Sequence, residues 1–454
     1  FWINTPEDKA NIEKLRVSQS LKEQYWKRTR GIIRTCLEKS VNALTELGIE
    51  PELAHKEVGG IPSTISIEGK INHAMEQLEI SWKYSSPIEA CDKELIVKNV
   101  IEDIFSSNGL EVTFKAKPLE GVAGSGGHTH IGASVKTKDG RIVNLFAPKN
   151  LHEDFLSEIG YGAIMGLLKN YEVVSPLVTS TSDEFNRLVP GFEAPICTVV
   201  SLGHNYDVPS RNRSVLVGTI RDLDNALSTR FELRAPSAET NKYLVTAACY
   251  QTMLDGIEAV AKSGLSTKEL EKEISKQPGE ESFYLEKDKA YRDEENIFEK
   301  YSQEELENRF SILPRTVFEN MKKIRHEEPK IKVLYKGDIF TRQILHSFKV
   351  GALEKWYKEL YYRIIKKDVK ILRSIIKKHS NDNMDALDEV NWNVISDLKY
   401  DIMKDTLTKK SLFTRIVEAL DNKEYQTASD LQIELKEKIS EIQELYIAYK
   451  KNIF

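Results

Sequence analysis

The chain has 454 residues, of which 40% are hydrophobic and 30% are charged, a composition typical of a globular protein with an ample core. Its 65 basic and 70 acidic residues give a net charge of −5, so a global basic field for nucleic acid is absent. No run approaches the roughly 18 uninterrupted apolar residues of a membrane helix. We therefore expect neither a nucleic-acid nor a membrane partner, and the length alone suggests about three domains.

The cysteines indicate a reducing compartment. The chain has four, widely spaced and without a C-x-x-C pair, which favours reduced thiols. No signal-peptide pattern follows Phe1. We therefore predict a cytoplasmic protein.

The first part of the chain, residues 6–48, is predicted to be helical. Thr5 can cap this helix, Pro6 suits its first turn, and acidic residues follow near its positive end. Residues 50–260 instead mix short β-like runs with helical patterns, separated by turns that contain Gly or Pro. The predicted strands include 110–114 and 215–220, and the predicted helices include 94–106 and 243–261.

The last part of the chain is predicted to be mainly helical. Residues 265–345 are highly charged and less periodic, whereas helical spacing is clear from Gly351 onward. An apolar stripe near the end indicates either packing on the same chain or a coiled coil or subunit contact. A basic run before it is best explained as a solvated helix face. The stripe comprises Leu431, Leu435, Ile439, Ile442, Tyr446 and Tyr449, and the basic run comprises Lys366, Lys367, Lys370, Arg373, Lys377 and Lys378.

Charges at strand spacing mark the middle of the chain. The two-residue period of a strand places Arg230, Glu232 and Arg234 on one face and two apolar residues on the other. Three further pairs repeat this spacing. Each alone would fit an exposed strand face, but together they indicate a polar site. The pairs are His55 with Glu57, His128 with His130, and Arg211 with Arg213.

These residue types suit phosphoryl transfer. Carboxylates with a histidine favour Mg²⁺ or Mn²⁺ over Zn²⁺, and arginines suit phosphates and carboxylates. The glycines of residues 124–127 would let backbone approach a ligand closely. Catalysis by positioning and charge neutralisation fits this set. The chain has neither a P-loop motif nor the kinase H-R-D and D-F-G motifs.

Four ordered segments carry the motifs of the middle of the chain. They are Lys117-Pro118 followed by Gly124-Ser125-Gly126-Gly127-His128-Thr129-His130, then Asn186 to Pro195, then Arg211-Asn212-Arg213-Ser214, then Arg230-Phe231-Glu232-Leu233-Arg234. Together these segments resemble signatures of the glutamine synthetase family. Each alone is modest, but the ordered set is highly specific, and the resemblance covers roughly residues 1–362.

The resemblance implies an α+β fold, with a catalytic domain at residues 1–362 whose antiparallel strands form a funnel. Residues 363–454 would form a helical extension with oligomer contacts, as in type III-like members. It also implies a ligase that phosphorylates the γ-carboxylate of glutamate with ATP. Ammonia then displaces phosphate to give glutamine, ADP and phosphate. The implied assembly is a homo-oligomeric ring.

The resemblance also implies a role for each matching residue. Two Mg²⁺ or Mn²⁺ ions per site would be held by Glu57, Glu79, His128 and Glu232. The nucleotide side would comprise His55, His130, Ser125, Arg213 and Arg230. The backbone of Gly124 would border glutamate. Arg187 and Arg234 would hold carboxylates and the transferring phosphoryl group, and Glu193 would close over glutamate and take a proton from ammonium.

Three positions depart from the family pattern. Ala123 replaces an Asn that touches the substrate amino acid. Gly218 replaces an Arg that reaches phosphate, with Arg221 as a nearby substitute, and Gly132 replaces a Ser. The alternatives are a γ-glutamyl-amine ligase, an inactive scaffold, a guanidino kinase or a pure oligomerisation module.

The start of the chain resembles the interior of a family member. Phe1-Trp2-Ile3 is similar to the end of a strand that carries an E-x-E of metal ligands in the family. That E-x-E and a small β-rich domain would precede Phe1. We therefore expect the sequence to be an N-terminally truncated piece that lacks part of both metal sites.

Overall fold

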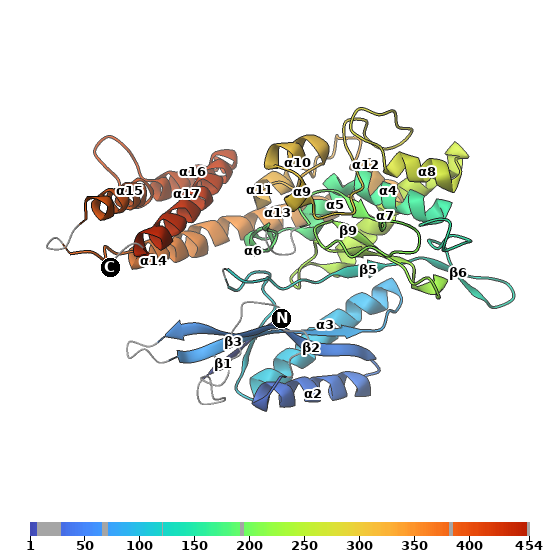
Figure 1. Cartoon of the computed structure of the whole chain (residues 1–454), viewed down its shortest axis with the longest axis horizontal. Coiled ribbons are helices and arrows are strands. Elements are labelled where there is room, and N and C mark those ends of the chain that lie inside the picture. Colours follow the sequence, from blue (N-terminus) through green and yellow to red (C-terminus); the bar gives the residue numbers. More distant parts are fainter. Residues whose placement is uncertain (7–28, 66–70, 120, 191–194, 381–384, 452–454) are drawn as a thin grey trace. The chain divides into compact units, whose positions relative to one another are not determined.

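The computed structural model describes residues 1–6, 29–65, 71–119, 121–190, 195–380 and 385–451, and for residues 58–65 and 71–74 it describes the backbone alone. The chain divides into two compact units (Figure 1). The sheet unit comprises residues 1–179, 186–313 and 332–339, and the helical unit comprises residues 180–185, 314–331 and 340–454. The helical unit thus begins well before residue 363, where the sequence placed a domain boundary.

The first sheet of the sheet unit has the order β2-β3-β1-β4. Helices α2 and α3 pack against it, because apolar residues of both helices and of β1 and β3 share one buried cluster (Figure 1, blue). The elements are β1 (Trp2–Pro6), β2 (Pro51–Ile65), β3 (Ile71–Trp82), β4 (Glu111–Thr113), α2 (Gly31–Glu46) and α3 (Pro87–Ser107).

The predicted start of the first helix was wrong. Thr5 and Pro6 lie in β1, paired antiparallel with Ala74 and His73 of β3. The cap and first-turn signals are local, and the long-range pairing with β3 overrides them. The predicted helix end near residue 48 is confirmed, since α2 ends at Glu46.

The second sheet has the order β5-β10-β9-β8, with β10 antiparallel to both of its neighbours. Phe231 and Leu233 of β10 are completely buried, whereas Arg230 and Glu232 are only partly buried, which confirms the predicted alternation along the strand. Arg234, directly after the strand, is buried. The register sets Glu232 between His130 and Gly218. The strands are β5 (Thr129–Ile131), β8 (Val200–Ser201), β9 (Val217–Ile220) and β10 (Arg230–Leu233).

Helices α4 (Glu158–Lys169) and α7 (Lys242–Ser263) approach each other backbone to backbone. A Cβ added to Gly166 would lie 2.2 Å from the Thr252 carbonyl oxygen, and one added to Gly256 would lie 2.1 Å from that of Gly162. Only glycine permits this distance. The remaining elements of the unit are β6 (Ser134–Lys136), β7 (Ile142–Asn144), α5 (Tyr171–Val178), η2 (Ala226–Ser228), α8 (Thr267–Ile274), α9 (Ile297–Lys300), α10 (Gln303–Arg309), α12 (Lys332–Tyr335) and η3 (Lys336–Asp338).

The helical unit buries the apolar stripe within the chain. Five of its six residues are buried on α17, which packs on α11, α15 and α16, so the same-chain alternative is confirmed. The basic run is exposed, as a solvated face requires. No described helix is long and apolar enough to cross a membrane. The helices are α11 (Val317–Met321), α13 (Arg342–Lys358), the π-helical η4 (Glu359–Ile364), α14 (Ile365–Ser374), α15 (Ala386–Met403), α16 (Leu412–Asp421) and α17 (Tyr425–Lys451), while α6 (Ser182–Arg187) begins in this unit.

Candidate active site

A cavity of about 2750 Å³ opens in the sheet unit. Ligand sites usually measure about 300–1,000 Å³, so this cavity has room for more than one ligand. Its lining draws charged residues from both sheets and from the loops that follow their strands. The predicted site residues in the lining are Glu57, Glu79, Gly124, His128, His130, Arg187, Arg213, Arg230 and Glu232.

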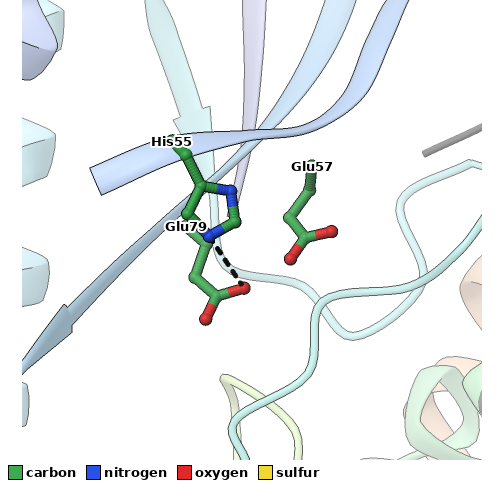
Figure 2. Close-up of side chains that lie close together, drawn as sticks. All are labelled: His55, Glu57 and Glu79. Atoms are coloured by element: carbon green, nitrogen blue, oxygen red, sulfur yellow. Dashed lines mark ion pairs between the residues drawn. The ribbon is translucent and has the colours of Figure 1, made fainter. Parts of the chain in front are cut away.

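The β2–β3 hairpin gathers three ligand-type side chains, which we call the hairpin cluster: His55, Glu57 and Glu79. Register places His55 opposite Glu79, and the register shifts by one residue between Lys56 and Val58, at Glu57. Such a bulge re-aims a side chain. Ligand atoms of all three residues lie within 4.8 Å of one another (Figure 2).

The hairpin cluster is rich in acid. His55 Nε2 lies 3.9 Å from Glu79 Oε2, and the Glu79 side chain is about half exposed. A hydrogen bond between Glu57 and Glu79 lowers the pKa of Glu79, burial opposes this shift, and His55 reinforces it. One imidazole and two carboxylates at this spacing fit a hard divalent cation such as Mg²⁺ or Mn²⁺.

A second group forms across β5 and β10, and we call it the strand cluster: His128, His130, Arg230, Glu232 and Arg234. His128 Nδ1 lies 3.2 Å from Glu232 Oε1, and Arg234 Nη1 donates to Glu232 Oε2 at 2.7 Å. Arg230 Nε donates to His130 Nδ1 at 2.9 Å. The antiparallel register thus brings together the two histidines and three charges that the sequence placed on separate strands.

Burial and contacts within the strand cluster shift the pKa values of Glu232 and His130. Burial alone would raise the pKa of Glu232, but hydrogen bonding to His128 and the charge of Arg234 outweigh it and lower the pKa to about 2. Burial lowers the pKa of His130 to about 4, against the opposing charge of Glu232. Glu232 is therefore an anion and His130 is neutral at pH 7, which suits the pair His128 and Glu232 to a second cation.

The arginines differ in how firmly they are held. Arg187 is buried and donates to the carbonyl oxygens of Ala235 at 2.8 Å and Arg234 at 3.1 Å. These bonds fix its guanidinium at the cavity wall just after β10. Arg213 is exposed in the lining, so it is the more adaptable cation.

Some predicted residues do not reach the described lining. Ser125 is completely buried and His55 faces the hairpin cluster, and neither belongs to the described lining of the cavity. Glu193 lies outside the described residues. Arg221 was a wrong choice to replace an arginine at Gly218, because its buried guanidinium donates to the carbonyl oxygens of Leu151, Asp154 and Tyr206.

The glycines of the loop at residues 124–127 lie very close to other atoms of the protein, and the predicted close approach of a ligand to this loop stays a prediction. A Cβ on Gly124 would lie 2.3 Å from the Ala116 carbonyl oxygen and 2.7 Å from Arg187 Cγ, and one on Gly127 would lie 2.4 Å from the Ser237 carbonyl oxygen. The missing side chains therefore admit the protein's own groups. These glycines border the cavity because the loop packs tightly against its walls.

Two cavity residues without a predicted role contact the glycine loop. Gln77 Nε2 donates to the Gly124 carbonyl oxygen at 2.9 Å and so ties β3 to the glycine loop. Lys242, the first residue of α7, reaches Gly127. Gln77 begins the Gln-Leu-Glu segment that ends at the predicted ligand Glu79. No local sequence pattern marks Lys242.

Comparisons with known proteins find related sequences. Residues 7–331 match the family model described as glutamine synthetase, catalytic domain. The glutamine synthetase of Clostridium saccharobutylicum is 31% identical over 314 residues, 69% of this chain and 57% of the relative. That of Sulfolobus acidocaldarius is 37% identical over 184 residues, 40% of this chain and 36% of the relative. That of Staphylococcus aureus is 34% identical over 227 residues, 49% of this chain and 43% of the relative. The matched stretches thus span about half of these relatives' lengths or less.

Proposed function

This chain belongs to the glutamine synthetase family, and from that premise we propose that it forms glutamine from glutamate and ammonia at the expense of ATP. A glutamate γ-carboxylate oxygen attacks the terminal phosphorus of ATP, and ADP leaves. Ammonia then attacks the γ-carbonyl carbon, and phosphate leaves with the electron pair of the C–O bond.

The observation that carries the proposal is the presence of two ligand clusters at one large cavity. The hairpin cluster offers Glu57 and Glu79 within 4.8 Å of one another and of His55, and the strand cluster offers His128 beside Glu232. In this proposal each cluster holds one Mg²⁺ or Mn²⁺. Bound metal would neutralise phosphate charge.

The chain's own cations would position both substrates. Arg230 and Arg213 would face the ATP phosphates with His130, because guanidinium groups match phosphate oxygens in bidentate geometry. Arg187 would hold a glutamate carboxylate. Its two backbone acceptors preorganise it at the wall, so little side-chain entropy is lost on binding. Glu193 remains the predicted acceptor of the ammonium proton.

A second reaction of the same kind is favoured by two small residues. Ala123 lies in the cavity lining next to Gly124, and among the described residues an added Cβ on Gly218 would meet only Glu232 Oε2, at 3.4 Å. Small side chains here leave room for a larger acceptor, so ligation of glutamate to an amine is the alternative. A ring-shaped homo-oligomer in the cytoplasm stays a prediction, as do the oligomer contacts of residues 363–454.

The test is γ-glutamyl transfer to hydroxylamine by the full-length protein with ATP, Mg²⁺ and glutamate. We expect hydroxamate that depends on all three. Product with another amino acid or amine, but none with saturating glutamate and ammonia, would contradict glutamine synthesis while keeping the ligase. Calorimetry without Mg²⁺-dependent ATP binding would favour an inactive scaffold.

A further inference from the structure

Lys242 is a buried cation at the edge of the cavity. It is the first residue of α7, directly after the capping Asn241, and its side chain is only 9% exposed. A lysine is unfavourable at this end of a helix, because the helix dipole is positive there. The contacts of its ammonium group must therefore account for its position.

The ammonium group joins two segments of the site. Its Nζ donates to the Gly127 carbonyl oxygen at 2.5 Å and to the Ser237 carbonyl oxygen at 3.3 Å. It also lies 3.4 Å from Thr129 Oγ1. Gly127 and Thr129 flank His128, and Ser237 follows the strand that carries Glu232. Three oxygens offset the cost of burying an ammonium ion.

Gly127 fits this contact. An added Cβ would lie 2.7 Å from Lys242 Nζ, so a side chain there would collide with the ammonium group. The backbone N–H of Gly127 donates to the Pro236 carbonyl oxygen at 2.9 Å. The residue before His128 is therefore held on both sides of its backbone, by a strand-like bridge and by a charged donor.

We propose that Lys242 is a positioning residue that holds the backbone around His128 so that its imidazole meets Glu232. This inference rests on the proposed function, in which His128 and Glu232 bind a divalent cation. Partners outside the ligand shell orient the ligands, and losing one typically weakens metal binding about 10- to 100-fold.

The test measures Mn²⁺ binding to the full-length protein, with free Mn²⁺ detected by electron paramagnetic resonance. Lys242→Met keeps the aliphatic stem and removes the donor. We expect binding at one site to weaken about tenfold, at the low end for ligand-orienting partners. The matched control is Lys98→Met, because Lys98 Nζ donates to the Ala238 carbonyl oxygen at 2.6 Å in the same turn but does not contact the glycine loop. We expect this control to bind Mn²⁺ like the wild type.

Hydrogen exchange on the metal-free protein gives a second readout. We expect faster exchange in residues 125–131 of Lys242→Met and no change there in Lys98→Met. Should Lys242→Met not fold, Lys242→Gln takes its place with the same expected direction. Wild-type Mn²⁺ binding in the Lys242 variant, equal weakening in both lysine variants, or unchanged exchange would overturn the inference. A wild type that binds Mn²⁺ but makes no hydroxamate would sink the proposed reaction alone.

Discussion

The two ligand clusters at the cavity differ in their balance of acidic and basic side chains. The hairpin cluster sets two carboxylates and one histidine together on β2 and β3, with Glu79 about half exposed. The strand cluster sets one carboxylate among two histidines and two arginines on β5 and β10, and its Glu232 side chain is 14% exposed.

This difference teaches which cluster depends on a cation. Two carboxylates near one another favour binding a divalent ion, because like charges repel until one is protonated or a cation arrives. In the strand cluster, Glu232 is already paired with Arg234, whose guanidinium donates to it. We therefore expect the strand cluster to contribute to folding without metal, and the hairpin cluster to contribute chiefly when metal is bound.

The largest effect is expected from Glu232→Ala, which leaves Arg234 without its carboxylate. Hydroxamate formation should fall on the order of 10³-fold, since both charge positioning and a metal ligand are lost. The control is Glu299→Ala, an exposed carboxylate at the same cavity outside both clusters. Activity that survives in Glu232→Ala would show that β10 is not a metal strand.

The stability of the metal-free protein should depend on pH through Glu232. Its pKa is about 2 when folded against an ordinary 4.5, so the folded state binds fewer protons between these values. The contribution is complete above about pH 4.5 and is lost as pH falls toward 2, a total of roughly 3 kcal/mol. Denaturant unfolding in EDTA from pH 2 to 7 measures it.

Glu232→Gln isolates this contribution from that of His130, whose own pKa is lowered to about 4. The stability difference between wild type and Glu232→Gln should shrink as the solution is acidified from pH 5 to pH 3. A stability difference that does not depend on pH would contradict the lowered pKa of Glu232.

Glu79→Gln should separate metal binding from stability. Removing one carboxylate ligand of the hairpin cluster should weaken Mn²⁺ binding at one site by more than the roughly 10- to 100-fold that loss of a ligand-orienting partner costs. Unfolding in EDTA should change by less than about 1 kcal/mol, because the Glu79 side chain is about half exposed and glutamine can also hydrogen-bond to Glu57. Glu52→Gln, an exposed glutamate on the neighbouring strand β2, serves as the control. A large loss of stability in the metal-free protein would mean that the hairpin cluster, like the strand cluster, stabilises the fold without metal.

The smallest effect is expected at Gly218, the neighbour of Glu232 on β9. An added Cβ would make an ordinary contact with Glu232 Oε2 at 3.4 Å. Gly218→Ala should therefore raise the free energy of unfolding slightly, by up to about 1 kcal/mol, because glycine loses more backbone freedom in a strand. Thermal unfolding tests it, and a drop of several degrees would show that the strand cluster tolerates no added atom.

The sequence alone predicted many of the side chains of the site. The alternation at residues 230–234 predicted which side of β10 is apolar, and Phe231 and Leu233 are indeed fully buried. The pairing of Glu57 with Glu79 was harder, since many residues separate them. The hairpin register and the bulge at Glu57 bring them together, and neither feature follows from local composition.

Other features were misjudged because their partners are distant in the chain. Thr5 and Pro6 carry helix-start signals, yet pairing with β3 makes them strand. Arg221 stands close in sequence to Gly218, yet three carbonyl oxygens hold its guanidinium. Local propensity is a weak preference that a set of long-range hydrogen bonds readily exceeds.

The length, composition and charge of the sequence by themselves determined that the chain is globular and acidic, and its ordered motifs determined the family and the inventory of carboxylates, histidines and arginines. Only the tertiary structure decided which of these meet. Antiparallel register places Glu232 beside His130, a bulge turns Glu57 toward Glu79, and Lys242 holds the backbone at His128 from the start of a distant helix. The physical reason is that each residue's type fixes the chemistry of its side chain, whereas the electrostatic interactions of a site depend on separations of a few ångströms between residues far apart in the chain.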